Sequence, residues 1–231
     1  MPLKIDLHCH SFFSGDGISS PEELIEAARR KGLHGFALTD HNNCEGVEYM
    51  IAQGLIRPDG QPVNGILVIP GVEVTTGDGH LLCIGTTLPD MNGAPVADVC
   101  RAIHCRGGLA IPAHPFDLFR SGISESAMDS LEIDAIEVFN SATTLRRYNR
   151  KALDYARRRG LPMIAGSDAH HQTALGTAFT ILDTNDFSLQ GALRQIPGKN
   201  TRSERYLTAT DTIRKTWNNW LRLKRRRPEA G

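Results

Sequence analysis

The sequence predicts an α/β protein of the (β/α)-barrel type, and three observations support this. Short apolar or β-branched runs alternate with amphipathic helical stretches, a pattern typical of βα units around a parallel sheet. Eight of these runs have the character of strands, which is about the number in a (β/α) barrel. Histidines and carboxylates stand at the ends of these runs, where barrel enzymes carry their chemistry.

The predicted strands are separated by turn-forming residues and helical patterns. In chain order they span residues 3–8, 34–40, 66–74, 80–86, 108–114, 134–140, 162–167 and 177–182. Residues 57–65 are dense in Gly, Pro, Asn and Asp, and so predict a surface loop before the third strand.

Start and stop signals mark the predicted helices. The first helix begins with Ser20 as N-cap and Pro21 in the first turn, and it ends at Gly32. A second helix is expected near 95–106. A third is expected near 144–159, with arginines in its last turn that complement the helix dipole.

The length of 231 residues suits one barrel-sized domain, which we assign to residues 1–200. Two small domains would also fit this length, but no linker divides the chain. A helix near 203–222 places Trp217 and Trp220 at helical spacing and leads into a run of Lys and Arg. Residues 201–231 are therefore expected to be a C-terminal helix and basic tail, part of the same domain or appended to it.

Composition excludes several classes of protein. Basic and acidic side chains number 26 each, so no overall field attracts nucleic acid or anionic lipid. No apolar run approaches the roughly 20 residues that cross a bilayer, and no signal-peptide pattern precedes the first strand. We therefore expect a cytoplasmic protein with no membrane partner. The five cysteines form no C-x-x-C pair, which favours reduced thiols over disulfides or a thiolate zinc site.

Nine side chains of the types that bind divalent cations form an ordered series along the chain. They are His8, His10, Asp16, His41, Glu73, His80, His114, Asp168 and His170. Within a strand, residues two apart share a face, so His8 and His10 can hold one ion while Cys9 points away. Glu73 stands inside an otherwise apolar strand, where burial without a partner is costly, and a carboxylate can bridge two cations.

Any one of these residues could equally be an ordinary polar residue at a strand end or in a loop. Six of the nine histidines at such ends are hard to ascribe to chance. The other three differ: His34 lies at a helix-to-strand junction and His104 inside a helix, where packed or solvated roles are expected. His171 follows a predicted ligand and is a candidate for touching substrate or donating a proton. Asp40, beside His41, is expected to orient that imidazole.

Five blocks of this series resemble the polymerase and histidinol phosphatase (PHP) family, in family order over residues 3 to about 185. They are Asp6-Leu7-His8-Cys9-His10-Ser11, Leu38-Thr39-Asp40-His41, Pro70-Gly71-Val72-Glu73, Ala113-His114-Pro115 and Gly166-Ser167-Asp168-Ala169-His170. The resemblance implies a distorted (β/α)7 barrel with two or three divalent ions at its strand ends, hydrolysing phosphoesters. The sequence departs at Asn42-Asn43, where many members have an aspartate after the histidine, and it has no large inserted substrate-binding segment.

The donor set suggests a mechanism. Six imidazoles and three carboxylates give a formal charge of minus three, so three divalent ions would leave a positive pocket that attracts phosphate. Mixed imidazole and carboxylate donors suit Zn, Mn or Fe better than Mg or Ca. A metal-activated hydroxide would then attack phosphorus, with Asp40, His171 or metal-bound water as proton donor to the leaving oxygen. Arg120, Arg146 and Arg147, placed on loops leaving the mouth, are candidates for binding phosphate oxygens, although solvated arginine is the commoner role.

Three classes of function remain open. The leading hypothesis is a phosphatase or phosphodiesterase acting on a small phosphorylated metabolite or nucleotide. A 3'-5' exonuclease or oligonucleotide-end nuclease is less favoured, because the net charge is zero and the barrel sequence has no interleaved basic and aromatic stretches. A noncatalytic metal-binding module is the third, although carboxylate-rich sites without thiolates are unlike closed structural zinc sites. An amide hydrolase on the same barrel type also remains open.

Overall fold

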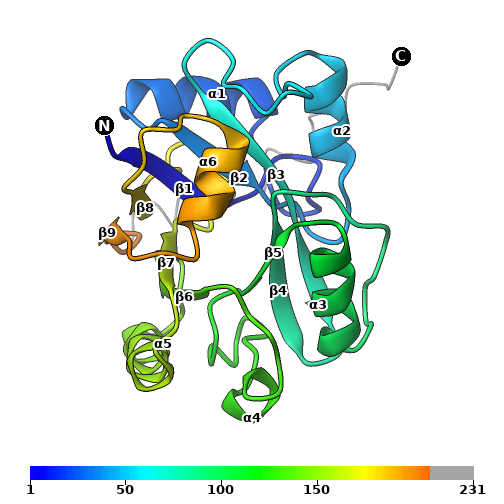
Figure 1. Cartoon of the computed structure of the whole chain (residues 1–231), viewed down its shortest axis with the longest axis vertical. Helices are drawn as coiled ribbons and strands as arrows, with labels where there is room; N and C mark the ends of the chain where they lie inside the picture. Colours follow the sequence, from blue (N-terminus) through cyan, green and yellow to red (C-terminus); the bar gives the residue numbers. More distant parts are fainter. Residues whose placement is uncertain (209–231) are drawn as a thin grey trace.

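The computed structural model describes residues 1–208, and Figure 1 shows how its elements are arranged. The strands are β1 Leu3–Cys9, β2 Gly35–Leu38, β3 Leu67–Thr76, β4 Gly79–Ile84, β5 Leu109–Pro112, β6 Ile136–Asn140, β7 Met163–Gly166, β8 Phe179–Leu182 and β9 Thr201–Ser203. The helices are α1 Pro21–Arg30, α2 Glu45–Ala52, α3 Val96–Cys105, α4 Glu125–Met128, α5 Arg146–Arg159 and α6 Leu189–Gln195. All eight predicted strands are confirmed, as are the three helices expected before residue 160.

The strands curl into a distorted barrel. One sheet has the order β5-β4-β3-β2-β1-β8-β9, and β6 pairs with β7 in a second. Strands β1, β2 and β3 are parallel neighbours, whereas β4 is antiparallel to both β3 and β5. The β3–β4 hairpin presents Glu73 and His80 from adjacent strands, with Thr75 paired to His80.

The distortion arises where β1 meets two different strands along one edge. Its first half pairs with the antiparallel β8, from Leu3 opposite Leu182 to Ile5 opposite Thr180. Its second half meets the segment after β7 instead, where the Asp168 N–H donates to His8 O at 2.8 Å. A side chain links β7 to β8 where backbone hydrogen bonds would otherwise do so. The Thr180 Oγ1 of β8 accepts from Ala165 N and donates to Ala165 O of β7.

An apolar cluster drawn from strands all around the barrel fills its interior. It includes Ile69 of β3, Leu82 of β4 and Ile111 of β5, and all three are fully buried. Ala192 and Ile196, from α6 and its C-cap, pack onto the same cluster, so this short helix closes the end of the barrel opposite the strand ends. The predicted donors at the other end therefore stand on a rigid apolar base.

Local capping residues mark the start of α1 and the end of α5. Ser20 begins α1 in a capping box, accepting from Glu23 N while Glu23 accepts from Ser20 N. Gly160 ends α5 in the left-handed conformation, with φ 63°. The sequence did not indicate α2, α4 or α6, which are short. Cys44 at the start of α2 makes no side-chain cap bond, so no cap residue marks that helix.

The C-terminal prediction needs a correction. Residues 201–203 form strand β9, antiparallel to β8, and 204–208 form no regular element, so the helix predicted near 203–222 does not begin at 203. Strand pairing with β8 at these positions takes the place of the predicted helix. The rest of that prediction, with Trp217, Trp220, Leu221 and the basic run, lies outside the described residues. The division at residue 200 stays a prediction.

Within 1–208 no helix is long and apolar enough to cross a membrane, and the cytoplasmic localisation stays a prediction.

Gly166, the last residue of β7, allows β7 to approach β1 and β6 closely. A Cβ at this position would lie 2.5 Å from His8 Cβ and 2.6 Å from Glu137 Oε1. We expect Gly166→Ala to lower the free energy of unfolding by about 1–3 kcal/mol, the usual cost of overpacking. Urea unfolding in the presence of a chelator measures this without a contribution from metal binding. Gly77→Ala is the control, because a Cβ there makes only ordinary contacts; an equal loss in both variants would refute the close-approach argument.

Candidate metal centre

Glu73 lies at the centre of the barrel mouth, with its side chain 1% exposed. Two imidazole nitrogens face its Oε1: His80 Nδ1 at 2.8 Å and His114 Nε2 at 3.0 Å. Three face its Oε2: His8 Nε2 at 3.1 Å, His10 Nε2 at 3.2 Å and His41 Nδ1 at 3.3 Å. The two oxygens of one carboxylate thus face two different groups of donors.

The predicted donors do converge in space. Four groups of three have their ligand atoms within 4.8 Å of one another: His8, His10 and Glu73; His8, His114 and Asp168; His41, Glu73 and His80; His10, His41 and His170. The groups share members, so they form one connected cluster. Asp16 completes the predicted set from the 11–17 loop.

The 11–17 loop folds back over the mouth and brings Asp16 to the cluster. Asp16 Oδ2 lies 2.7 Å from His170 Nε2, and its Oδ1 accepts a hydrogen bond from Ser14 Oγ. The same Ser14 Oγ accepts from His41 N, so one hydroxyl fixes both the loop and the end of β2. Gly17 permits the tight return, because a Cβ there would lie 1.8 Å from Ser11 O.

The two carboxylate oxygens of Asp168 have different surroundings. Oδ2 lies 2.7 Å from Arg120 Nη2 and accepts from Asn140 Nδ2 at 3.0 Å. Oδ1 has no hydrogen-bond partner among the described residues and faces His10 Nε2 and His170 Nδ1, both at 3.4 Å. Asp168 adopts a left-handed φ of 53°, a conformation that is uncommon outside glycine and often found at functional sites.

Hydrogen bonds fix the tautomers of two histidines. His8 Nδ1 lies 3.1 Å from Glu137 Oε1, and His170 Nδ1 lies 3.0 Å from Asp168 O. A carboxylate and a carbonyl only accept, so each Nδ1 carries a proton, and Nε2, which faces Glu73 in His8 and Asp16 in His170, is the nitrogen that would bind a cation. This is the arrangement in which a second partner orients a metal-binding imidazole.

A divalent cation fits these residues. Buried polar atoms in proteins are normally hydrogen-bonded. Here both ring nitrogens of His10, Nδ1 of His114 and Oδ1 of Asp168 are buried without a hydrogen-bond partner among the described residues. Imidazole nitrogens and carboxylate oxygens without thiolates are donors for Zn, Mn or Fe. The atoms that lack partners are therefore of the types that such ions bind.

The electrostatics of the cluster keep its carboxylates charged. Burial opposes the charge on Glu73, but the surrounding imidazoles, His8 foremost, hold its pKa well below the usual range. Burial likewise opposes the charge on Asp168, and Arg120 and His8 outweigh it to lower that pKa. Burial lowers the pKa of His41 to about 4, which leaves this imidazole neutral and able to ligate at neutral pH.

Other predicted residues lie at different places. Asp40 is 2% exposed and accepts from Ser11 N at 2.6 Å and Ser11 Oγ at 2.7 Å. Its carboxylate therefore anchors the 11–17 loop, and it makes no hydrogen bond to His41, contrary to the expected orienting contact. His171, half-buried beside His170, has its Nδ1 2.9 Å from Thr173 Oγ1. The roles of Asp40 and His171 as proton donors stay predictions.

The three arginines predicted to bind phosphate lie in different parts of the structure. Arg120 is brought to the cluster, where it contacts Asp168 and donates to Ala142 O at 3.0 Å. Arg146 and Arg147 begin α5 rather than lying on a loop, which corrects that expectation, because the α5 helix starts as soon as the 141–145 segment leaves β6. Both are exposed and stack on tyrosines, Arg146 over Tyr206 and Arg147 over Tyr148. His34 and His104 lie outside the cluster, as expected, and His104 pairs with Asp134 at 2.9 Å.

Sequence reasoning missed Glu137, a fully buried carboxylate in β6. Besides His8, it accepts from His114 N at 2.7 Å and from Asn140 Nδ2 at 3.1 Å. The available signal was the same as for Glu73, an acidic residue inside an apolar strand. Asn140 and Asp117 were also missed, and no local pattern would have found them.

Asn42 explains the departure from the family pattern. It has a left-handed φ of 56°, which asparagine tolerates better than most residues. Its side chain accepts from Thr75 N at 2.7 Å and donates to Thr75 Oγ1, which lies 3.3 Å from His80 Nε2. Asn42 thus supports a predicted ligand through Thr75, so this departure leaves the donor cluster intact.

Comparison with known families bears on this cluster directly. The model of the PHP domain family matches residues 6–215. The chain belongs to the PHP domain family. This PHP protein is an enzyme, a metal-dependent phosphoesterase.

Related proteins and structures agree with this assignment. A probable phosphatase from Caldicellulosiruptor bescii is 26% identical over 208 residues, covering 76% of this chain and 83% of the relative. PsfC from Pseudomonas syringae has a similar structure, with a TM-score of 0.70 at 18% identity over 96% of this chain and 98% of PsfC. A lesion-specific endonuclease from Pyrococcus furiosus has a TM-score of 0.69 at 18% identity over 100% of this chain and 74% of the endonuclease. At these identities the two structures establish the barrel fold alone.

The Glu137 contacts generate a prediction about metal affinity. We expect Glu137→Ala to weaken metal binding by about 10–100-fold, because His8 loses the carboxylate that orients it. Glu137→Gln, which keeps an acceptor for His8 Nδ1, should weaken binding less. Competition with a chromophoric chelator measures both affinities. Glu132→Ala removes an exposed carboxylate from the same segment and should have no effect; equal affinities for all four proteins would contradict the proposed role of Glu137.

Proposed function

We propose that this PHP protein hydrolyses phosphoesters at a cluster of two or three divalent ions. The ligands proposed are His8, His10, Asp16, His41, Glu73, His80, His114, Asp168 and His170. The observation that carries the proposal is that the two oxygens of Glu73 face separate sets of imidazoles, so that Glu73 and these histidines would provide donors for more than one cation. Zn, Mn and Fe are the metals proposed from the donor types.

When bound, such ions acidify a water molecule and neutralise the charge of a phosphate group. The chain's own residues prepare the site for this chemistry. Arg120 and Asn140 hold Asp168 so that its Oδ1 faces the histidines, and Glu137 holds His8. Arg120 uses two of its five N–H donors on Asp168 and Ala142, so donors remain for a phosphate oxygen. His171 and Asp40 are the side chains proposed to supply a proton to the leaving oxygen, and of the two only His171 is appreciably exposed.

The substrate proposed first is a small phosphorylated metabolite or nucleotide. The probable phosphatase from Caldicellulosiruptor bescii, which matches most of this chain, supports this choice. A nuclease acting on oligonucleotide ends is the second candidate. One observation favours it, an exposed group of cations at the start of α5 that carries no carboxylate partners for its arginines within residues 1–208.

Loss of a ligand should abolish hydrolysis and remove metal. We expect His10→Ala and Asp168→Ala to reduce turnover of an aryl phosphate below detection and to lower the metal content per chain. His104→Ala is the control: it removes an imidazole outside the cluster, and Asp134 still accepts from Ala110 N. Activity assays and elemental analysis on the same preparations check this. Wild-type rates in either ligand variant would count decisively against the assignment.

The proposed function itself is tested by a screen of phosphoesters with metal-reconstituted protein. Protein is stripped with a chelator, loaded separately with Zn, Mn or Fe, and assayed on phosphomonoesters, phosphodiesters and short oligonucleotides. We expect hydrolysis that depends on the added metal, and an increase in melting temperature on loading, because the ions bind the folded state. Metal binding without turnover of any ester would instead favour the noncatalytic module, and turnover of amides alone would favour an amide hydrolase.

A further inference from the structure

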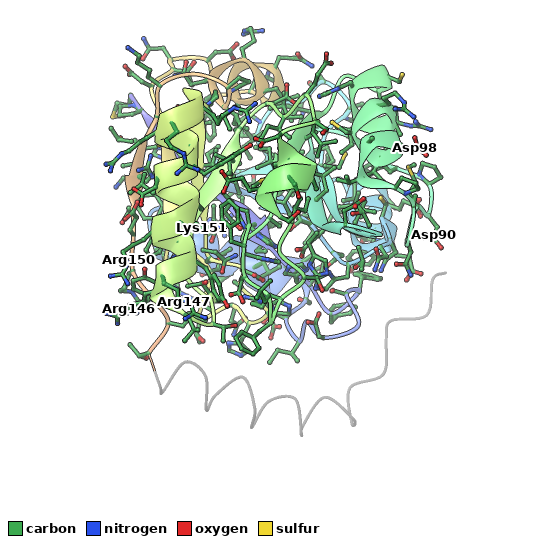
Figure 2. The ribbon with its side chains drawn as sticks, turned by 90° about the horizontal axis from the view of Figure 1, so that it is seen from below. Asp90, Asp98, Arg146, Arg147, Arg150 and Lys151 are labelled. Carbon is green, nitrogen blue, oxygen red and sulfur yellow. The ribbon has the colours of Figure 1, made fainter. Side chains whose placement is uncertain are left out.

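Cations gather at one end of α5 on a protein whose formal net charge is zero. Arg146, Arg147, Arg150 and Lys151 are exposed and lie together at that end of the helix, as Figure 2 shows. Figure 2 also shows the acidic Asp90 and Asp98 on the opposite side of the molecule. Although the formal net charge of the chain is zero, this part of its surface is strongly basic.

Three of these four cations have no carboxylate partner within the described residues, whereas Lys151 lies 4.0 Å from Glu125. Within residues 1–208, no ion pair joins Arg146, Arg147 or Arg150 to a carboxylate, whereas Arg158 and Arg159 at the other end of α5 pair with Glu125 and Asp129. Like charges four residues apart on a helix destabilise it, as do cations in the first turn. Their presence is therefore better explained by an anionic ligand than by stability.

Aromatic rings hold two of these arginines in place. The guanidinium of Arg146 lies 4.5 Å from the ring centre of Tyr206, and that of Arg147 lies 5.1 Å from the ring centre of Tyr148. A guanidinium that stacks on an aromatic ring keeps its charge, and most of its N–H groups, which point outward in the plane of the guanidinium, stay available as donors. These two side chains are thus oriented, and they retain donors for phosphate.

An exposed apolar loop adjoins this end of α5. Phe119 is 71% exposed and Leu118 is 80% exposed, while Leu145, just before α5, is 39% exposed. The buried Asp117 ties the two segments together, accepting from Thr143 Oγ1 at 3.0 Å and Thr144 N at 2.8 Å. Phe119 is therefore held in solvent beside the basic end of the helix.

This surface is connected to the metal centre. Arg120, the residue after Phe119, contacts Asp168 and donates to Ala142 O. One loop thus carries an exposed phenyl ring and, at the next residue, the side chain that positions a proposed ligand. A substrate bound across Phe119 and α5 has its neighbouring phosphate close to the catalytic mouth.

We propose that Phe119, Leu118, Leu145, Arg146, Arg147 and Arg150, the α5 rim, bind a single strand of nucleic acid. An unpaired base stacks on Phe119 while successive phosphates contact the arginines, a combination that tolerates any sequence. Paired bases cannot stack on a side chain in this way, so the occupant is single-stranded. The inference rests on the proposed function and assigns its second candidate substrate class to a defined surface.

Fluorescence anisotropy tests the α5 rim with the full-length, metal-loaded protein. The probe is a labelled 12-nucleotide oligothymidylate with phosphorothioate linkages, which keep the backbone charge and resist hydrolysis. We expect Arg146→Gln/Arg147→Gln/Arg150→Gln to weaken binding by at least about tenfold, and to reduce the slope of log K against log salt by about 2, since three phosphate contacts are lost. Arg157→Gln/Arg158→Gln/Arg159→Gln, with the same charge change on the same helix, should stay within about twofold of wild type.

A second pair of variants tests stacking. Phe119→Ser should weaken binding several-fold and leave the salt slope unchanged, because no phosphate contact is lost. Ile51→Ser, an exposed apolar residue of α2, is the control and should have no effect. Melting curves establish that all variants are folded.

Several results would overturn the inference: no binding by wild type, equal loss in the two arginine triples, no effect of Phe119→Ser, or equal affinity for a duplex of the same sequence. Displacement by phosphatidylserine vesicles that depends on the arginines but not on Phe119 would assign the surface to a membrane instead. Failure of the proposed function is a separate result. In that case no ester is hydrolysed with any metal, whereas the anisotropy measurements still report on the α5 rim.

Discussion

The burial of Glu73 is the constraint on which the rest of the mouth depends. A carboxylate with 1% of its side chain exposed is strongly destabilising unless charges or donors surround it. The fold surrounds Glu73 with five imidazoles, from β1, β4 and the ends of β2 and β5. Those imidazoles are themselves costly to bury without partners. Bound cations would compensate the charge of the Glu73 carboxylate and would bind the lone pairs of the imidazole nitrogens. The apolar interior sealed by α6 provides the rigid base on which this arrangement stands.

Close approach and backbone strain are concentrated around that constraint. His114 and Asp168 adopt positive φ values of 29° and 53° two residues after the ends of β5 and β7, where each side chain enters the mouth. Gly46 serves the same end, because a Cβ there would lie 2.3 Å from Asp40 Oδ2, the oxygen that anchors Ser11. Residues that touch no proposed ligand thus determine how accurately the ligands are placed.

Much of the fold and most of the donor cluster could be predicted from the sequence, because each signal is local. A strand ending in His-x-His, or an acidic residue between apolar neighbours, is visible within a few residues. Glu137 carries the same local signal as Glu73 and was missed because it belongs to no recognised block. Asn140 and Asp117 could not have been found, since their partners Asp168, Thr143 and Thr144 lie 26 to 28 residues away. The helix near 203–222 failed at its start because pairing with β8 overrides helical propensity at 201–203.

The same distinction between sequence and space applies to substrate recognition. Along the chain, basic and aromatic residues are not interleaved in the barrel, and the net charge is zero, so a polyanionic substrate is not indicated. In the fold, Asp117 and Arg120 bind the 115–122 loop to the 141–145 segment. This places an exposed Phe119 beside the first arginines of α5, which have no carboxylate partner within residues 1–208. Arg120 contacts Asp168 from the same loop, so movement of Phe119 on binding a base would shift Arg120 and, through it, the position of Asp168, a proposed metal ligand. The same short loop therefore carries Phe119, the proposed contact with substrate, and Arg120, which positions a proposed metal ligand. A count of charges along the sequence cannot show this.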